Sequence, residues 1–369
     1  MVRRLLSLNG LATLGVVLYH ATGWGFTAMF WWTNRYLPLE VPNFDQLGGA
    51  GYYFLRVVEQ LVIFSIPAFL FVSGYFIAVA AGRSQKTISW QVVKSRILNL
   101  VIPFVLWSVL ILVAKIVQGE QYTVMEFVST ILTGRTADPF YFVPALVLLY
   151  LISPFLVPLA RNHWKSLLVV SLLIQSSIVF LRTLQLLPID LSTLKPFMIL
   201  TRSYLPFGFI FWFSSGIVIG FHLGTLKSFF VRYRWVALVS LVIFFIAGLI
   251  EWESILRMSG QEWIGPRETL IDNAYALAVL AAFIGFERAR LPLSGPLSQL
   301  GTRSFGVYLV HTPVLEYSAR LIYHVAPWLL ASQFLLQPGL FVLGLGIPLL
   351  LMSAVNRSPA RKYYGYIFG

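Results

Sequence analysis

The sequence contains no cysteine, and few of its residues are charged. Without cysteine, a disulfide-stapled secreted fold, a thiol nucleophile and a thiolate metal site are all excluded. Charged residues make up 11% of the chain, against about 25% in an ordinary soluble domain, and this excludes a soluble enzyme. Hydrophobic residues make up 58% of the 369 residues. The aromatic content of 16% excludes a disordered chain. The composition is that of an integral membrane protein.

Apolar stretches separated by polar or charged breaks predict ten helices that cross a bilayer. We place them at residues 5–31, 52–80, 92–116, 141–158, 165–187, 203–224, 235–250, 270–287, 303–325 and 335–356. The fourth and seventh are short for a membrane span. The connections between the segments are short, so we predict an all-α bundle of about ten transmembrane helices, with residues 1–369 forming a single domain.

The net charge of +13 would suggest nucleic-acid binding in a soluble protein. In a membrane protein, the positions of the basic residues are more informative than their sum. With ten helices and an internal N-terminus, most of the 27 Lys and Arg residues lie in internal segments, and nearly all of the 14 Asp and Glu residues lie outside. The positive-inside rule then predicts that both termini are cytoplasmic. We expect a multi-pass protein of the plasma (inner) membrane with no nucleic-acid partner.

Two histidines, His20 and His311, lie well inside predicted helices, away from their ends. His20 follows Arg4 by 16 residues, about 24 Å along a helix, which places it in the outer half of the bilayer. Asn9 lies 11 positions before His20 and so shares its helix face. Imidazole titrates near neutral pH, so His20 could act as a general base toward a hydroxyl, although a histidine that only packs between helices is an equal alternative. His311, eight residues after Arg303, is the second candidate for a cavity histidine.

The second predicted helix contains Pro67, which frees a backbone carbonyl, so this helix should be kinked or interrupted. Such a break can expose backbone groups to a cavity. Ser73 and Gly74 either line that cavity or merely permit tight helix packing. Glu59, in the outer half of the segment, faces either a polar acceptor cavity or the lipid headgroups.

Basic residues at the cytoplasmic boundary could hold a phosphorylated donor, because guanidinium groups offer paired hydrogen-bond donors to phosphate. The candidates are Lys94, Arg96 and Arg303. Topology and contacts with lipid headgroups would explain the same residues. The spacing of His, Asp and Glu suggests no metal site, and Walker A and dinucleotide-binding motifs are absent from the sequence.

Taken together, the segments resemble the acyltransferase-3 family of multi-span membrane acyltransferases. The similar stretches follow the family's order: Leu8–Ala12 through Val16–His20, Ile66–Phe76, Arg96–Trp107, Phe140–Pro144 with Tyr150–Pro154, and Leu300–Pro313. They cover essentially the whole chain. His20 matches the family's N-terminal histidine, and Asn9 stands where the family typically has an arginine.

The resemblance implies transfer of an acyl group, most often acetyl from cytoplasmic acetyl-CoA, to a hydroxyl of a lipid-linked or surface glycan. The expected partners are acyl-CoA, the carbohydrate acceptor and membrane lipids, with no permanently bound cofactor or metal. The candidate residues are His20 and His311 for catalysis, Lys94, Arg96 and Arg303 for the donor, and Asn9, Glu59 and Ser73 for the acceptor. His20 would either activate the acceptor hydroxyl or carry the acyl group transiently. A transporter or flippase of a glycan precursor, and a catalytically silent scaffold of an envelope assembly complex, remain as alternatives.

Overall fold

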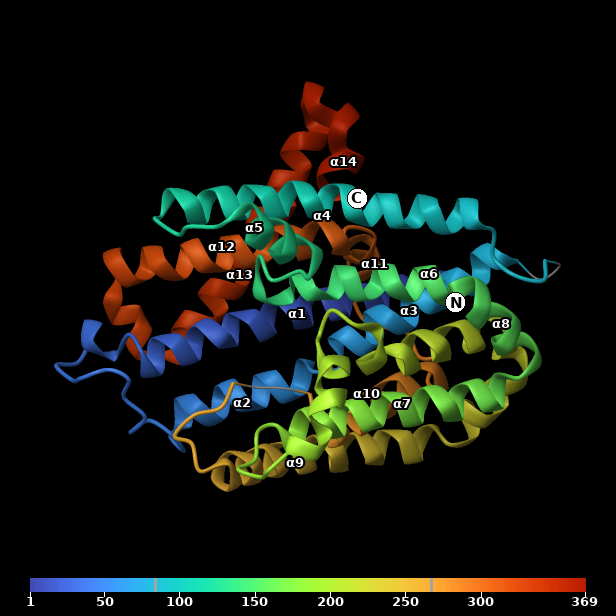
Figure 1. Ribbon diagram of the computed structural model, residues 1–369, viewed down its shortest axis with the longest axis horizontal. Coiled ribbons are helices and arrows are strands. Elements are labelled where there is room, and N and C mark those ends of the chain that lie inside the picture. Colours follow the sequence, from blue (N-terminus) through green and yellow to red (C-terminus); the bar gives the residue numbers. More distant parts are fainter. Residues whose placement is uncertain (83–84, 266–267) are drawn as a thin grey trace.

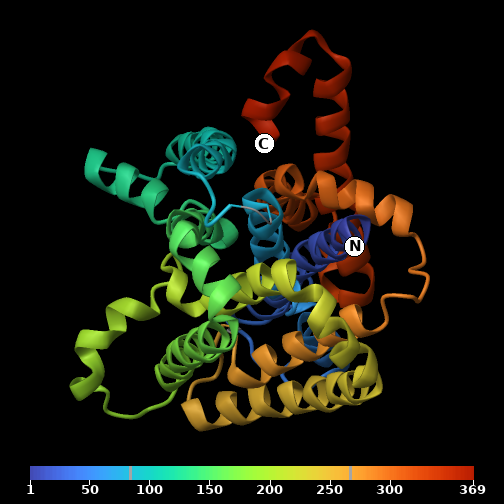
Figure 2. The same cartoon turned by 90° about the vertical axis from the view of Figure 1, so that its right-hand side faces the viewer.

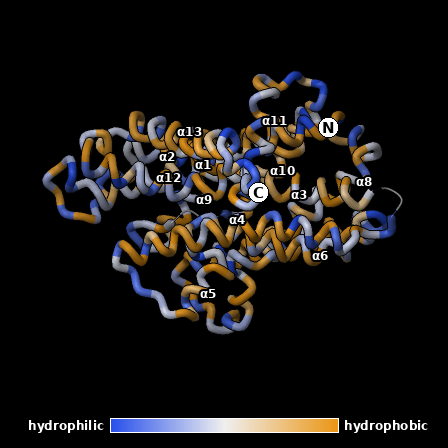
Figure 3. Tube along the Cα trace, turned by 90° about the horizontal axis from the view of Figure 1, so that it is seen from above, coloured by the Kyte–Doolittle hydropathy of each residue, from blue (hydrophilic) through white to orange (hydrophobic). Residues whose placement is uncertain are grey.

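The computed structural model describes residues 1–82, 85–265 and 268–369. These residues form fourteen α-helices and short 3-10 turns, with no strand among them. Eight helical stretches within this part of the chain are long and apolar enough to cross a membrane. Most of the long helices run side by side along the longest axis (Figure 1), and hydrophobic residues dominate along them (Figure 3). The all-α, membrane-type fold class is therefore confirmed.

Each predicted segment coincides with helical structure. The corresponding helices are α1 (Val2–Phe30), α2 (Ala50–Val62) with α3 (Ser65–Ala81), α4 (Trp90–Val117), α6 (Phe142–Asn162), α7 (Trp164–Leu184), α8 (Ile210–Arg232), α9 (Arg234–Ser259), α10 (Leu270–Gly285), α12 (Ser304–Val325) and α13 (Gln333–Arg357). The expectation that the fourth and seventh segments are short is wrong, because α6 has 21 residues and α9 has 26. The hydrophobic run of α9 stops before Glu251, but Glu, Leu, Arg and Met are good helix formers and the helix continues.

Three short helices correspond to no predicted segment: α5 (Val124–Leu132), α11 (Ser294–Thr302) and α14 (Tyr364–Phe368). α5 begins with a capping box, in which the Thr123 hydroxyl accepts from the Glu126 N–H while the Glu126 carboxylate accepts from the Thr123 N–H. α14 lies against α4, where the Trp107 indole donates to the carbonyl of Ile367 at 2.9 Å. These helices are too short to span a membrane, so hydropathy does not detect them.

The second segment is interrupted, as Pro67 predicts. α2 ends at Val62, α3 begins at Ser65, and Pro67 lies in the first turn of α3. A missing N–H costs no intrahelical hydrogen bond at that position. The Ser65 hydroxyl donates to the Val62 carbonyl at 2.7 Å and so bridges the break.

The interior of the bundle contains α1 and α3, with other helices around them (Figure 2). α3 packs against α8 through glycine: a Cβ at Gly74 would lie 2.0 Å from the Phe213 carbonyl oxygen. A Cβ at Gly216 would lie equally close to the carbonyl oxygen of Phe71. Small residues therefore bring the two backbones into contact. Gly74 thus serves tight packing, the second of the two interpretations given for this pair.

Candidate active site

A cavity of about 1210 Å³ lies beside the break between α2 and α3. Its walls come from α1, the break itself, residues 133–142, the connection between α7 and α8, Glu268, and Tyr308 of α12. Drug-sized ligand pockets occupy about 300–1,000 Å³, so this cavity has room for a larger ligand. Several of its lining side chains are exposed, which connects the cavity with the surroundings.

His20 lines this cavity from α1. Its side chain is half-buried, and its ring centroid lies 5.3 Å from that of His311 and 5.5 Å from that of Tyr19. α1 is a regular helix with a largely buried surface, so it holds the imidazole in a defined position. A hydroxyl bound in the cavity can therefore reach the ring.

His311 is fully buried beside His20 and does not line the cavity. Its Nδ1 lies 2.7 Å from the carbonyl oxygen of Tyr308 and 3.2 Å from that of Val307. Both oxygens are acceptors only, so Nδ1 carries the proton and donates it. The other ring nitrogen, Nε2, lies 3.4 Å from the Thr312 hydroxyl. The backbone of its own helix thus fixes the orientation and tautomer of His311.

Asn9 lies on the same face of α1 as His20, and both side chains contact α12. The Asn9 amide donates to the Ser304 hydroxyl at 3.4 Å. Its Oδ1 is buried without a hydrogen-bond partner in the described part of the chain. The Asn9 side chain therefore lies at a helix interface, outside the lining of the large cavity.

Arg4 joins α1 to the C-terminal end of α10. Its guanidinium donates to the carbonyls of Phe283 at 3.0 Å, Phe286 at 2.8 Å, Glu287 at 2.9 Å and Ala289 at 3.0 Å. Carbonyls at the end of a helix lack intrahelical partners and carry partial negative charge. Arg4 satisfies several of them at once, so its side chain has a structural role.

The three predicted donor-binding residues lie away from His20. Lys94 and Arg303 are exposed, and Arg96 is half-buried and donates to the Phe76 carbonyl at 3.2 Å. None of the three lines the large cavity. Within residues 1–82, 85–265 and 268–369, no group of three His, Asp or Glu residues could hold a metal ion.

Glu59 is buried in the protein interior, outside the large cavity. It forms an ion pair with Arg56 on the same helix and accepts a hydrogen bond from the Thr22 hydroxyl at 3.2 Å. The Arg56 guanidinium lies 4.6 Å from the ring centroid of Trp252. Ser73, the third predicted acceptor residue, is half-buried on α3 and does not line the cavity either.

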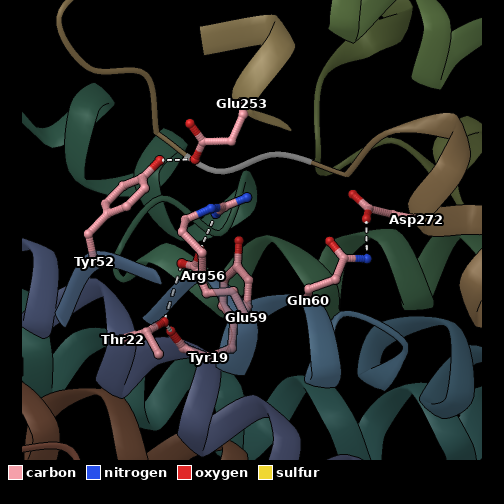
Figure 4. A network of polar contacts seen from close by, with 8 residues as sticks. All are labelled: Tyr19, Thr22, Tyr52, Arg56, Glu59, Gln60, Glu253 and Asp272. Atoms are coloured by element: carbon pink, nitrogen blue, oxygen red, sulfur yellow. Dashed lines mark hydrogen bonds and ion pairs between the residues drawn. The ribbon is translucent and has the colours of Figure 1, made fainter. Parts of the chain in front are cut away.

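The polar contacts around Glu59 extend from α2 to α9 and α10. The Gln60 amide donates to Asp272 at 2.9 Å, and the Tyr52 hydroxyl donates to Glu253 at 2.5 Å (Figure 4). A small cavity of about 20 Å³ lies among these groups, and a space of this size holds one water molecule. Tyr19 and Ile63 line both the small and the large cavity.

The sequence interpretation missed the charged residues of the large cavity. They are Arg135, Asp138, Arg182, Lys195, Arg202 and Glu268. All of them lie in external loops or outer helix halves of the expected ten-helix topology, where the positive-inside rule leaves basic residues uncommon. The presence of basic residues in those segments could have indicated a site on the outer side. Only the fold shows that the four basic residues of this set share one cavity.

Arg182 and Glu268 are neighbours in this wall. The Arg182 Nε donates to the Thr201 carbonyl at 2.9 Å, and the guanidinium lies 5.5 Å from the ring centroid of Phe209. Burial raises the pKa of Glu268 to about 7, a shift that Arg182 opposes and the Asp272 carboxylate increases. The charge of the cavity wall therefore changes near neutral pH.

Distant relatives are found among curated proteins. The probable poly-beta-1,6-N-acetyl-D-glucosamine export proteins of Staphylococcus aureus strains MSSA476, MRSA252 and MW2 are each 21% identical over 262 residues, which cover 70% of this chain and 71% of the relative. No solved structure matches the chain. The sequence profile of the acyltransferase-3 family, described as an acyltransferase domain, matches residues 6–353. The chain therefore belongs to the acyltransferase-3 family, as its ordered motifs predict.

Proposed function

We propose that the protein is a membrane O-acyltransferase, which moves an acyl group, in the first instance acetyl, from cytoplasmic acyl-CoA to a hydroxyl of a cell-surface or lipid-linked carbohydrate. One observation carries the proposal: His20, at the position of the family's N-terminal histidine, faces a cavity of about 1210 Å³. Family membership supports the reaction class. The name of the relatives, which refers to a poly-N-acetylglucosamine, supports a polysaccharide acceptor.

We also propose that ten helices cross the plasma (inner) membrane, with both termini in the cytoplasm. α10, with 16 residues, and α12, with 22, complete the eight longer apolar stretches. The alternation of directions along the chain then places residues 133–141 and 185–209 on the outer side. The cavity with His20 thus opens toward an extracytoplasmic acceptor.

In the proposed reaction, His20 takes the proton of the acceptor hydroxyl as its oxygen attacks the carbonyl carbon of the thioester. The new C–O bond forms, the C–S bond breaks, and the leaving thiolate recovers the proton from the imidazolium. The products are an ester of the glycan and free coenzyme A. His311 supports this step by holding the ring of His20 from the buried side.

Lys94, Arg96 and Arg303 remain the proposed contacts for the phosphates of the donor at the cytoplasmic end. They lie near the starts of α4 and α12, so the thioester arm must extend from there into the bundle. This arrangement keeps the charged part of the donor near water and brings only its reactive end to His20.

Purified protein, labelled acetyl-CoA and chitotetraose provide the test. We expect acetylated chitotetraose with the wild type and a loss of transfer of at least about 100-fold in His20→Ala, the range for removal of a general base. His163→Ala is the matched control, because His163 is an exposed histidine at the junction of α6 and α7. Equal transfer by His20→Ala and the wild type would contradict the proposed base.

A transporter of a glycan precursor is the second candidate, favoured by the word "export" in the name of the relatives. It predicts movement of the glycan without acyl chemistry. Mass analysis of surface glycans from a deletion strain separates the two: loss of acyl groups with normal glycan supports the transferase, and loss of the glycan itself supports transport.

A further inference from the structure

Four basic residues, Arg135, Arg182, Lys195 and Arg202, line the large cavity, and we name them the outer cation cluster. Among the described residues, two carboxylates, those of Asp138 and Glu268, share the wall with them. The segments that carry the cluster lie on the side where nearly all acidic residues are expected. Membrane topology does not favour basic residues on that side, so the local excess of positive charge needs another explanation.

Three members of the cluster form no ion pair with a described residue, unlike Arg56 and Arg320 of the same side. Arg56 and Arg320 form ion pairs with neighbouring glutamates on their own helices. In the described part of the chain, no ion pair involves Arg135, Lys195 or Arg202. Lys195 and Arg202 are exposed and line the cavity, so their charges are accessible to a ligand that enters it.

Arg182 gives the cluster a fixed inner member. Its Nε is held by the carbonyl of Thr201, and the Gly208 backbone lies so close to the guanidinium that a Cβ at Gly208 would lie 2.8 Å from it. Thr201 and Gly208 both belong to the connection between α7 and α8, which also carries Lys195 and Arg202. One segment thus positions three of the four cations along the cavity.

We propose that the outer cation cluster binds an anionic group of the acceptor, a phosphate, diphosphate or carboxylate carried by the glycan or by its lipid anchor. The inference rests on the proposed function and narrows its substrate class from carbohydrates in general to negatively charged ones. Guanidinium and ammonium groups form charge-assisted hydrogen bonds with these anions, about twice as strong as neutral ones. The anion docks at the outer cation cluster while a sugar hydroxyl extends toward His20 in the same cavity.

Binding to the purified full-length protein in lipid nanodiscs tests this without any transfer reaction. The probes are inorganic diphosphate, chitotetraose, 6-O-sulfated chitotetraose and coenzyme A. We expect the double variant Lys195→Gln/Arg202→Gln to bind diphosphate at least about tenfold more weakly, since the charge-assisted hydrogen bonds to the anion are lost. The matched control is Lys115→Gln/Arg257→Gln, two basic residues at the ends of α4 and α9 that do not line the cavity.

Coenzyme A separates the acceptor from the donor. Its affinity for the proposed donor site should be equal in the wild type and in the cavity variant, because that site lies at the other end of the bundle. If sulfated chitotetraose binds more tightly than chitotetraose, the anionic group of the acceptor belongs to the glycan. If only diphosphate binds, the anionic group belongs to the lipid carrier. Both results support the proposal. It is overturned if diphosphate does not bind or binds equally to the cavity variant, or if the variant loses coenzyme A affinity in parallel. Failure of transfer alone affects the proposed function and leaves these binding results interpretable.

Discussion

The imidazole rings of His20 on α1 and His311 on α12 lie with their centroids 5.3 Å apart, and only His20 lines the large cavity. The Nδ1–H of His311 is committed to the carbonyl of Tyr308 at 2.7 Å. A donor so engaged is unavailable to a substrate. The two histidines are therefore not equivalent: His20 can meet a hydroxyl, and His311 is placed to position it.

Substitutions of the two histidines should consequently lower kcat by different amounts. We expect His20→Ala to lower kcat by about 10²–10⁴-fold, which is the contribution of a general base. His311→Ala should lower kcat by roughly tenfold and leave the KM for acetyl-CoA unchanged, because this variant loses positioning of His20 and not the proton transfer itself. His311→Asn keeps an N–H near Nδ1 and should recover part of the rate. Steady-state kinetics checks this, and a His311→Ala variant as inactive as His20→Ala would instead place His311 in the chemical step.

Packing between α3 and α8 predicts a strong effect of one methyl group. In Gly74→Ala the new Cβ would lie 2.0 Å from the backbone oxygen of Phe213, so the two helices must separate. Overpacking typically costs about 1–3 kcal/mol or more, and we expect a clearly lower melting temperature in detergent. Gly224→Ala, on α8, is the control because a Cβ there meets nothing within 4 Å. Equal melting temperatures for the two variants would show that α3 and α8 are not held this closely.

The long helices of this protein can be predicted from its sequence because each of them contains a local apolar run, whereas the short helices α5, α11 and α14 cannot. The break before α3 can also be predicted, since Pro67 acts on its own first turn. The sequence also singles out His20 as a candidate cavity residue, because it is a polar residue in an apolar run. Lys195, Arg202 and Glu268 could not be predicted as cavity residues, because they come from connections whose path depends on distant contacts, such as the hydrogen bond from Arg182 to Thr201.

The buried ion pair of Arg56 and Glu59 gives a prediction about stability. Both side chains are nearly inaccessible, so removal of one partner leaves an uncompensated buried charge. Arg56→Met should destabilise the protein by about 3–5 kcal/mol, whereas Arg56→Met/Glu59→Met removes both charges and should cost less. Reversible unfolding in detergent and denaturant measures both values in a double-mutant cycle. A double variant less stable than Arg56→Met would show that the surrounding polar contacts, and not the pair itself, dominate.

Anion binding in the cavity should depend on pH through Glu268. Burial raises the pKa of this carboxyl to about 7, so the group is charged above that pH and neutral below it. A negative charge beside Arg182 weakens binding of an anion, and affinity for 6-O-sulfated chitotetraose should therefore rise several-fold from pH 8 to pH 6. The groups that act on Glu268 are Arg182, Asp272, Tyr141 and Tyr19.

The sulfate ester keeps its charge between pH 6 and pH 8, so a change of affinity over this range comes from a group of the protein. Glu268→Gln should bind the probe tightly at both pH values, and unsulfated chitotetraose should show no pH dependence in either form. A pH dependence that persists in Glu268→Gln would assign the titration to another group of the cavity.

A substitution of Arg4 tests whether Arg4 fulfils the role of the family's N-terminal arginine, whose position holds Asn9 in this chain. The guanidinium hydrogen-bonds to four carbonyls at the end of α10, and a side chain so occupied cannot also bind the donor. Arg4→Gln should therefore lower the stability by about 1–3 kcal/mol and leave the KM for acetyl-CoA unchanged. Arg3→Gln is the matched control, because Arg3 is its exposed neighbour on the same helix. A raised KM in Arg4→Gln at unchanged stability would mean instead that Arg4 takes over donor binding and that Asn9 marks a shift of the motif along α1.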